Sequence, residues 1–245
     1  LMQGASWLAG LCFLLFAGTV QALELGKQRS DYQASPDLRW LEAAPGELSP
    51  EQALEALRSG KGQRLGSRYP AMGFREQDQW FLLSLDNQSA TGLWYLRAGR
   101  PHLDYLDLYI YDAAGTLLRH QRSGDRVPFA ERPFPHHQLV FPLAIPQQAQ
   151  WSVLFRARGD NVIDFPLSIR APDEFNQHDG YLKLSYGFYF GSVLIMCLFN
   201  LLIFFSIREP SYLLYVLYLG FFGLNLFARE GLAYQWLWPG ASEWN

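Results

Sequence analysis

The chain has 245 residues, a formal net charge of −3 and 18% charged residues, and its apolar residues are concentrated toward the two ends. This nearly neutral balance gives no sign of a nucleic-acid-binding protein, which usually carries a basic face. The two cysteines, Cys12 and Cys197, lie in apolar runs, so the polar middle has neither disulfides nor thiolate metal sites.

The first apolar run covers residues 5–20 and is too short to cross a bilayer comfortably. It ends at Val20-Gln21-Ala22, a small-x-small pattern that signal peptidase cuts, which predicts a secretory signal over residues 1–22. The alternative is a retained N-terminal anchor. Because the chain begins at Leu1 and stops soon after its last apolar run, we expect it to be the N-terminal part of a longer protein.

Residues 23–173 are expected to form one β-rich domain. A short helix is predicted early in it, because Ser49 can cap the helix, Pro50 suits its first turn and Gln52 can complete a capping box. Short alternating segments follow without intervening helices, which favours a β-sandwich over a parallel α/β fold. The expected strands are 37–42, 80–86, 93–97, 102–111, 116–121, 138–143, 151–156 and 162–170.

The strand at 102–111 has two different faces. Leu106, Leu108 and Ile110 share one face, which is expected to turn toward the core, while Tyr109 and Tyr111 lie on the more polar face. An exposed aromatic platform is what carbohydrate recognition usually needs, so these two tyrosines are candidate ligand-binding residues. The alternative is ordinary packing, since large aromatic side chains are common in sandwich cores.

Two charge-free runs near the C-terminus are each long enough for a membrane-spanning helix of about 20 residues. The hairpin between them is short, so the two helices are expected to be antiparallel neighbours. The expected boundaries are a polar linker at 174–183, a first span at 184–207, a cytoplasmic hairpin at 208–211, a second span at 212–238 and the periplasmic start of a further loop at 239–245.

Small and polar residues inside the spans are candidates for helix packing. Gly187 and Gly191 form a small-xxx-small motif, which allows close approach of a neighbouring helix. Asn200 and Asn225 are polar residues in apolar surroundings, and each could donate a hydrogen bond to a neighbouring helix.

Several short motifs along the chain match one receptor family in their order. In the domain they are Gly73-Phe74, Trp80–Leu85, Leu103–Tyr109 and Gly124-Asp125-x-x-Pro128-Phe129 with Arg132. In the spans they are Tyr186–Gly191, Asn200-Leu-Leu, Tyr212–Tyr215 and Gly231–Pro239. Over residues 38–239 the chain resembles the bacterial seven-transmembrane receptors with diverse intracellular signalling modules (7TMR-DISM), in their type-2 extracellular domain and transmembrane start.

The resemblance implies a jelly-roll sandwich similar to carbohydrate-binding modules, which would bind a small-molecule or carbohydrate ligand. It also implies five further spans and a cytoplasmic output module, such as a diguanylate cyclase, a histidine kinase or a phosphatase. The expected location is the bacterial inner membrane, with the N-terminal domain in the periplasm.

Two loop features are further site candidates. Asp125, Arg126 and Arg132 could hold a polar ligand, although Gly124-Asp125 before Pro128 is also typical of a turn. His136 and His137 are adjacent, and adjacent side chains in a strand face opposite ways, so no shared metal site is expected there.

The sequence therefore predicts a mainly β protein, a jelly-roll-like sandwich followed by two antiparallel transmembrane helices, that acts as the sensory part of a membrane receptor. The alternatives are a membrane-anchored envelope protein that binds or processes carbohydrate, and a scaffolding protein without signalling output. No acid–base pair has diagnostic spacing, so no catalytic residue, cofactor or metal is assigned. The expected partners are the ligand, the lipid bilayer, further transmembrane helices and the output domain, and no nucleic acid.

Overall fold

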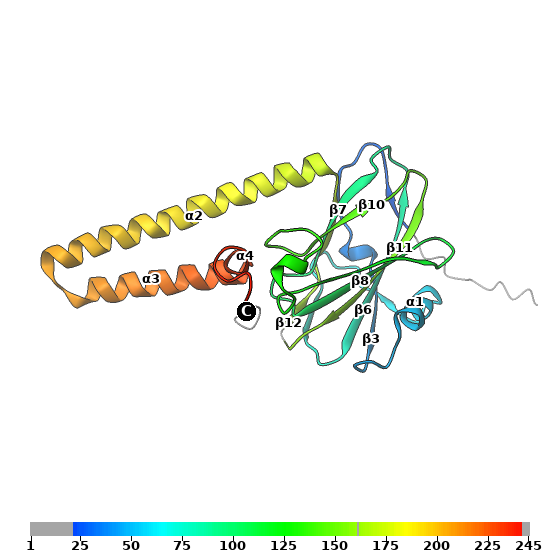
Figure 1. Ribbon diagram of the computed structural model, residues 1–245, viewed down its shortest axis with the longest axis horizontal. Coiled ribbons are helices and arrows are strands. Elements are labelled where there is room, and N and C mark those ends of the chain that lie inside the picture. Colours follow the sequence, from blue (N-terminus) through cyan, green and yellow to red (C-terminus); the bar gives the residue numbers. More distant parts are fainter. Residues whose placement is uncertain (1–21, 161, 242–245) are drawn as a thin grey trace, which may run out of the picture.

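The computed structural model describes residues 22–160 and 162–241, and Figure 1 shows two parts, a β-sandwich and a helical hairpin that extends from it. The predicted signal segment, 1–22, lies outside the described residues except for Ala22, and so do residues 242–245. The predicted fold class, a mainly β sandwich followed by two long apolar helices, is confirmed.

Within the described residues, two sheets build the sandwich. The larger sheet contains β1 (Leu23–Leu25), β3 (Arg39–Ala43), β4 (Gln63–Arg64), β6 (Asp78–Asn87), β8 (Tyr105–Tyr111), β9 (Leu117–Ser123) and β11 (Gln150–Arg158). The smaller sheet contains β2 (Asp31–Gln33), β7 (Leu93–Ala98), β10 (Val140–Ala144) and β13 (Leu167–Arg170). A separate ribbon pairs β5 (Ala71–Phe74) with β12 (Val162–Asp164).

The strand order explains how distant segments meet. The larger sheet runs β4-β3-β6-β11-β8-β9, with β1 parallel to β6, and the smaller sheet runs β10-β7-β13-β2. β11 lies between β6 and β8 in the middle of the larger sheet and is antiparallel to both. Each predicted strand has a counterpart, and the segment 162–170 divides into β12 and β13.

The main core lies between the two sheets. Leu106, Leu108 and Ile110 all point into it, which confirms the predicted inward face of β8. Phe81 of β6 stacks on Phe165 with ring centroids 4.1 Å apart, so the connection between β12 and β13 is also tied to this core.

A second apolar cluster lies on the opposite face of the larger sheet, under helix α1 (Pro50–Arg58). The predicted capping box is present: the Ser49 hydroxyl accepts from the Gln52 backbone N–H, and the Gln52 side chain accepts from the Ser49 N–H. The helix buries Ala53, Leu54 and Leu57 against the sheet. This face is therefore covered by a helix instead of being open to solvent.

Helix α2 (Pro172–Ile207) begins two residues after β13 and runs without a break into the first apolar span. The predicted linker at 174–183 is therefore the first part of α2, because Pro172 starts the helix and the helix continues through Gly180 into the span. Its 36 residues make a helix about 54 Å long at 1.5 Å per residue.

Helix α3 (Pro210–Arg229) follows after a left-handed cap at Arg208, so Glu209 and Arg208 alone separate the two long helices. The predicted second span at 212–238 is too long. Gly231 has φ +76° and interrupts the helix, and a short helix α4 (Leu232–Trp236) turns back against the sandwich. α2 and α3 are both long and apolar enough to cross a membrane.

Candidate functional site at the sandwich–helix junction

The segment from Gly124 to Gln138, called here the junction loop, connects β9 to β10 and contacts both α2 and α4. Gly124 has φ +143°, and a Cβ at this position would collide with the carbonyl of Asp104. Only glycine fits this close approach, so Gly124 fixes where the loop leaves β9. The Asp125 N–H then donates to the Leu103 carbonyl at 2.9 Å and holds the loop against the sandwich.

Arg132 holds the junction loop in shape. Its guanidinium is buried and donates to the carbonyls of His136 (3.0 Å), His137 (3.3 Å) and Gly124 (3.1 Å). Burial lowers the pKa of Arg132 to about 10, so the group still carries its charge at neutral pH. Because it already bonds to three carbonyls, Arg132 links the two ends of the loop and is not open to an external ligand.

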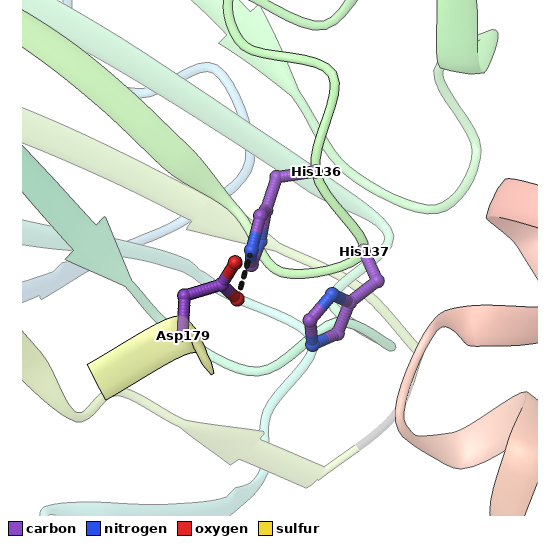
Figure 2. A group of neighbouring side chains, drawn as sticks. All are labelled: His136, His137 and Asp179. Carbon is purple, nitrogen blue, oxygen red and sulfur yellow. Dashed lines mark hydrogen bonds and ion pairs between the residues drawn. The ribbon is translucent and has the colours of Figure 1, made fainter. Parts of the chain in front are cut away.

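The contact with α2 is made by His136 and Asp179 (Figure 2), whose Nε2 and Oδ1 atoms are 2.9 Å apart. Asp179 also pairs with Lys183 one turn along α2, at 2.7 Å. Nearby, the ring of Phe175 stacks on Tyr95 of β7 with centroids 4.5 Å apart. The first turns of α2 are therefore held by both polar and aromatic contacts.

The hydrogen bonds around His136 assign its proton. The Gln138 backbone N–H donates to Nδ1 at 3.1 Å, so Nδ1 is unprotonated and Nε2–H donates to Asp179. His137 lies beside it, with ring centroids 4.2 Å apart. Burial, with a further contribution from His136, lowers the pKa of His137 to about 3, so this ring is neutral.

The expectation that the two histidines face apart is wrong, because residues 136 and 137 lie in a bent loop and not in a strand. His136, His137 and Asp179 each offer a ligand atom within 4.8 Å of the others. However, a metal on His136 Nε2 would need a proton on Nδ1, which faces the Gln138 N–H. With Lys183 already beside Asp179, the cluster fits a hydrogen-bonded contact better than a metal site.

The contact with α4 has a different chemistry. The Tyr234 hydroxyl donates to the Val127 carbonyl at 2.6 Å, and the Arg132 guanidinium lies 5.0 Å from the Tyr234 ring centroid. The Phe129 ring packs edge-on to Tyr234 with centroids 5.8 Å apart. Thus Arg132 supports both halves of the junction, α2 through the backbone that carries His136, and α4 directly.

Gly231 lets α4 approach the sandwich. A Cβ on Gly231 would collide with the carbonyl oxygen of His137 and would come within 2.9 Å of Pro101 Cβ. Its φ of +76° also suits glycine over other residues. At the same level the Tyr186 hydroxyl donates to Glu230 at 2.7 Å, which joins α2 to the end of α3.

Tyr109 and Tyr111 do not form the open platform that the sequence suggested. Tyr111 is only 1% exposed and Tyr109 9% exposed, because both lie in the cluster beneath α1. Tyr109 also stacks on His120, with ring centroids 4.4 Å apart. The period-two pattern correctly separated the two faces of β8, but it could not show that a helix covers the second face.

The three loop candidates do not converge on a common open site. Asp125 is buried, and burial followed by repulsion from Asp104 raises its pKa to about 6. Arg126 is exposed, whereas Arg132 is bonded to backbone carbonyls. Their arrangement favours the structural alternative, a turn that shapes the junction loop.

The span residues that were expected to pack helices together point away from the α2–α3 contact. A Cβ on Gly187 or Gly191 would meet nothing within 4 Å, whereas one on Gly223 would lie 3.5 Å from Val193. Asn200 donates to the Met196 carbonyl in its own helix, and Asn225 is exposed. Their role in packing against further helices remains a prediction.

Sequence reasoning missed Asp179, Gly231 and Tyr234 as junction residues. Gly231 and Tyr234 belong to the motif at 231–239 that carried the family resemblance, but they were assigned to a membrane span. Asp179 lies four residues before Lys183, a spacing that indicates a helix and could have extended α2 toward the sandwich.

A family model for the 7TMR-DISM extracellular 2 domain matches residues 35–171, more than half of the chain, and a model for the 7TM diverse intracellular signalling region matches residues 182–245. The chain belongs to the 7TMR-DISM family. It therefore has the sensory extracellular domain and the beginning of the membrane region of a 7TMR-DISM receptor. The boundary between the two matches, 172–181, coincides with the first turns of α2. The chain matches no curated protein.

Solved structures similar to the chain include a xylan-binding module CBM15, with 10% identity, 58% of this chain and 96% of that chain covered, and a TM-score of 0.28. An exo-β-1,3-galactanase from Phanerochaete chrysosporium has 13% identity, with 57% and 28% covered and a TM-score of 0.27. A GH115 4-O-methyl-α-glucuronidase has 10% identity, with 62% and 19% covered and a TM-score of 0.30. These similarities are too low to bear on ligand or activity.

Proposed function

We propose that the chain is the sensory part of a bacterial inner-membrane receptor, in which a periplasmic ligand acts on the sandwich and changes how the helices are held. The output would come from a cytoplasmic module of the longer protein, such as a diguanylate cyclase or a histidine kinase. The chain itself would bind and transmit without catalysing a reaction.

The observation that supports this proposal most directly is the junction loop, which contacts α2 through His136 and α4 through Arg132. A movement of the loop relative to the sandwich would therefore act on both helices. α2 is one continuous helix from the sandwich to Ile207, so no flexible linker is present to absorb such a movement. A ligand needs only a different affinity for two positions of the loop to shift their populations.

The coupling can be tested with single-molecule FRET on the chain in nanodiscs. Dyes would be placed at Ser67→Cys in the sandwich and Ser211→Cys near the hairpin, with Cys12 and Cys197 replaced by alanine. We expect a narrow distribution of transfer efficiency that broadens or shifts in His136→Ala. The exposed Arg68→Ala serves as a matched control in the sandwich. Identical distributions for native junction and His136→Ala would count against transmission through this loop.

The location can be tested with the same cysteines. A membrane-impermeant thiol reagent applied to cells with a permeabilised outer membrane should label Ser67→Cys. Ser211→Cys should be labelled only after the inner membrane is opened. The reverse pattern would contradict the periplasmic assignment of the sandwich.

The second candidate is a membrane-anchored carbohydrate-binding or scaffolding protein without signalling output. It predicts that the helices serve only as an anchor, so junction variants would leave the hairpin unaffected. The extended contacts of α2 and α4 with the sandwich favour the receptor, because a simple anchor would not need them.

A further inference from the structure

A cavity of about 180 Å³ lies where the sandwich meets the end of α3. Its walls come from the β7–β8 connection, from the β12–β13 connection and from the last residues of α3. The charged and titratable residues that line it are Arg97, Arg100, His102, Asp164, Arg229 and Glu230. The sandwich thus forms one side of the cavity, and a membrane-spanning helix forms the other.

The lining has an excess of positive charge. With His102 neutral, three arginines face two carboxylates, which leaves a net charge of +1. One carboxylate, Glu230, already accepts a hydrogen bond from Tyr186 at 2.7 Å. Over residues 22–160 and 162–241, none of the three arginines forms an ion pair with a carboxylate.

The arginines affect one another and the neighbouring histidine. Burial, followed by repulsion from Arg170 and Arg100, lowers the pKa of Arg97. Burial, followed by repulsion from Arg229, lowers the pKa of His102. Burial and neighbouring positive charges therefore both act against the charged forms of these two groups, and a bound anion would relieve this.

We propose that this cavity binds a small oxyanion, the phosphate or carboxylate group of a ligand, between Arg97 and Arg100 of the sandwich and Arg229 of α3. Guanidinium groups match phosphate and carboxylate oxygens through paired N–H donors. The cavity is smaller than the roughly 300–1,000 Å³ of sites for drug-sized ligands, which suits a single small group.

The proposal rests on the proposed sensory function in one respect, since it identifies the ligand chemistry through which the sandwich and α3 would be coupled. An anion that bonds to both sides would favour the arrangement in which they are close. The oxyanion could come from a free phosphate compound in the periplasm or from the headgroup of an anionic lipid, because the cavity lies at the end of a membrane-spanning helix.

The test is binding of inorganic phosphate to the chain in phosphatidylcholine nanodiscs, measured by equilibrium dialysis at constant ionic strength with chloride. We expect saturable binding that falls at least tenfold in the double variant Arg100→Gln/Arg229→Gln. Both residues are exposed and form no ion pair with a carboxylate, so the variant should fold, as thermal unfolding would confirm. Arg68→Gln, an exposed arginine of the sandwich outside the cavity, is the matched control.

No saturable phosphate binding, or equal binding in the native protein and the double variant, would overturn the site. Nanodiscs containing phosphatidylglycerol separate the two sources: a headgroup that occupies the cavity would compete with phosphate, whereas a site for free ligands would bind phosphate equally in both lipids. Adding phosphate to the protein labelled with the FRET pair then separates this proposal from the sensory one. Phosphate that binds without changing transfer efficiency would leave the site standing and contradict sensing through it.

Discussion

The two contacts of the junction loop differ in kind, although the same loop makes both. The contact with α2 is polar and titratable, since it joins His136 to Asp179 and Lys183. The contact with α4 depends on shape, since Gly231 must come close to the His137 carbonyl and Tyr234 must pack on Arg132. A change in protonation would therefore act on the hold on α2 while α4 stays packed.

The largest effect is expected from Arg132→Ala, because Arg132 supports both contacts. Losing its hydrogen bonds to three buried carbonyls should destabilise the junction by about 3 kcal/mol. Urea unfolding of the chain in detergent, followed by tryptophan fluorescence, would measure this. Arg126→Ala, at an exposed position of the same loop, should change stability little. Equal stability of the two variants would remove Arg132 from the centre of the junction.

Gly231→Ala should break the contact with α4 and spare the contact with α2. The new methyl group would collide with the His137 carbonyl and strain a left-handed residue, at a cost of about 2 kcal/mol. The rate of backbone amide hydrogen exchange should increase in residues 232–236 but not in residues 172–183. The control is Gly240→Ala, where a Cβ meets nothing within 4 Å. Equal exchange in both segments would show that the two contacts are not independent.

Acid should act on the side of the junction that faces α2, where the His137 ring lies beside His136 and Tyr186. The pKa of His137 is about 3 in the folded protein and near 6.5 when unfolded, so the unfolded state binds the extra proton. The contribution of this ring to the free energy of unfolding is therefore fully present above about pH 6.5. It falls as the pH drops toward 3 and is smaller by about 2 kcal/mol at pH 5. The titratable and charged groups around this ring are His136, Asp179, Lys183, Arg132 and Tyr186. His137→Phe should reduce the slope in a pH series of thermal unfolding, and an unchanged slope would assign the dependence to other groups.

The smallest effect is expected from Tyr234→Phe, which removes one hydroxyl and keeps the ring. The lost hydrogen bond to the Val127 carbonyl should cost about 1 kcal/mol. Thermal unfolding would show it. Tyr69→Phe, an exposed tyrosine of the sandwich, should have no effect. A larger loss than that of Gly231→Ala would mean that polarity, and not shape, governs the α4 contact.

The parts of the fold that depend on neighbouring residues could be predicted from the sequence. The capping box of Ser49 and Gln52 and the inward face of Leu106 and Leu108 are examples, because turns, caps and alternation are local. The junction could not be predicted, because it joins residues far apart in the chain. His136 and Asp179 are 43 positions apart, and Val127 and Tyr234 are 107 apart. The same limit explains Tyr111, which is buried by a helix from a distant segment.

The turn between α2 and α3 has a mechanical consequence. Arg208 and Glu209 are too short a connection for the two helices to slide past each other, so their relative motion must be a pivot about that end. α3 is about 30 Å long, and opening the pair by about 5° would part the other ends by about 3 Å. A separation of that size is enough to break the 2.7 Å hydrogen bond between Tyr186 and Glu230. A single contact made or broken near the sandwich would therefore change the angle between α2 and α3 at Arg208-Glu209.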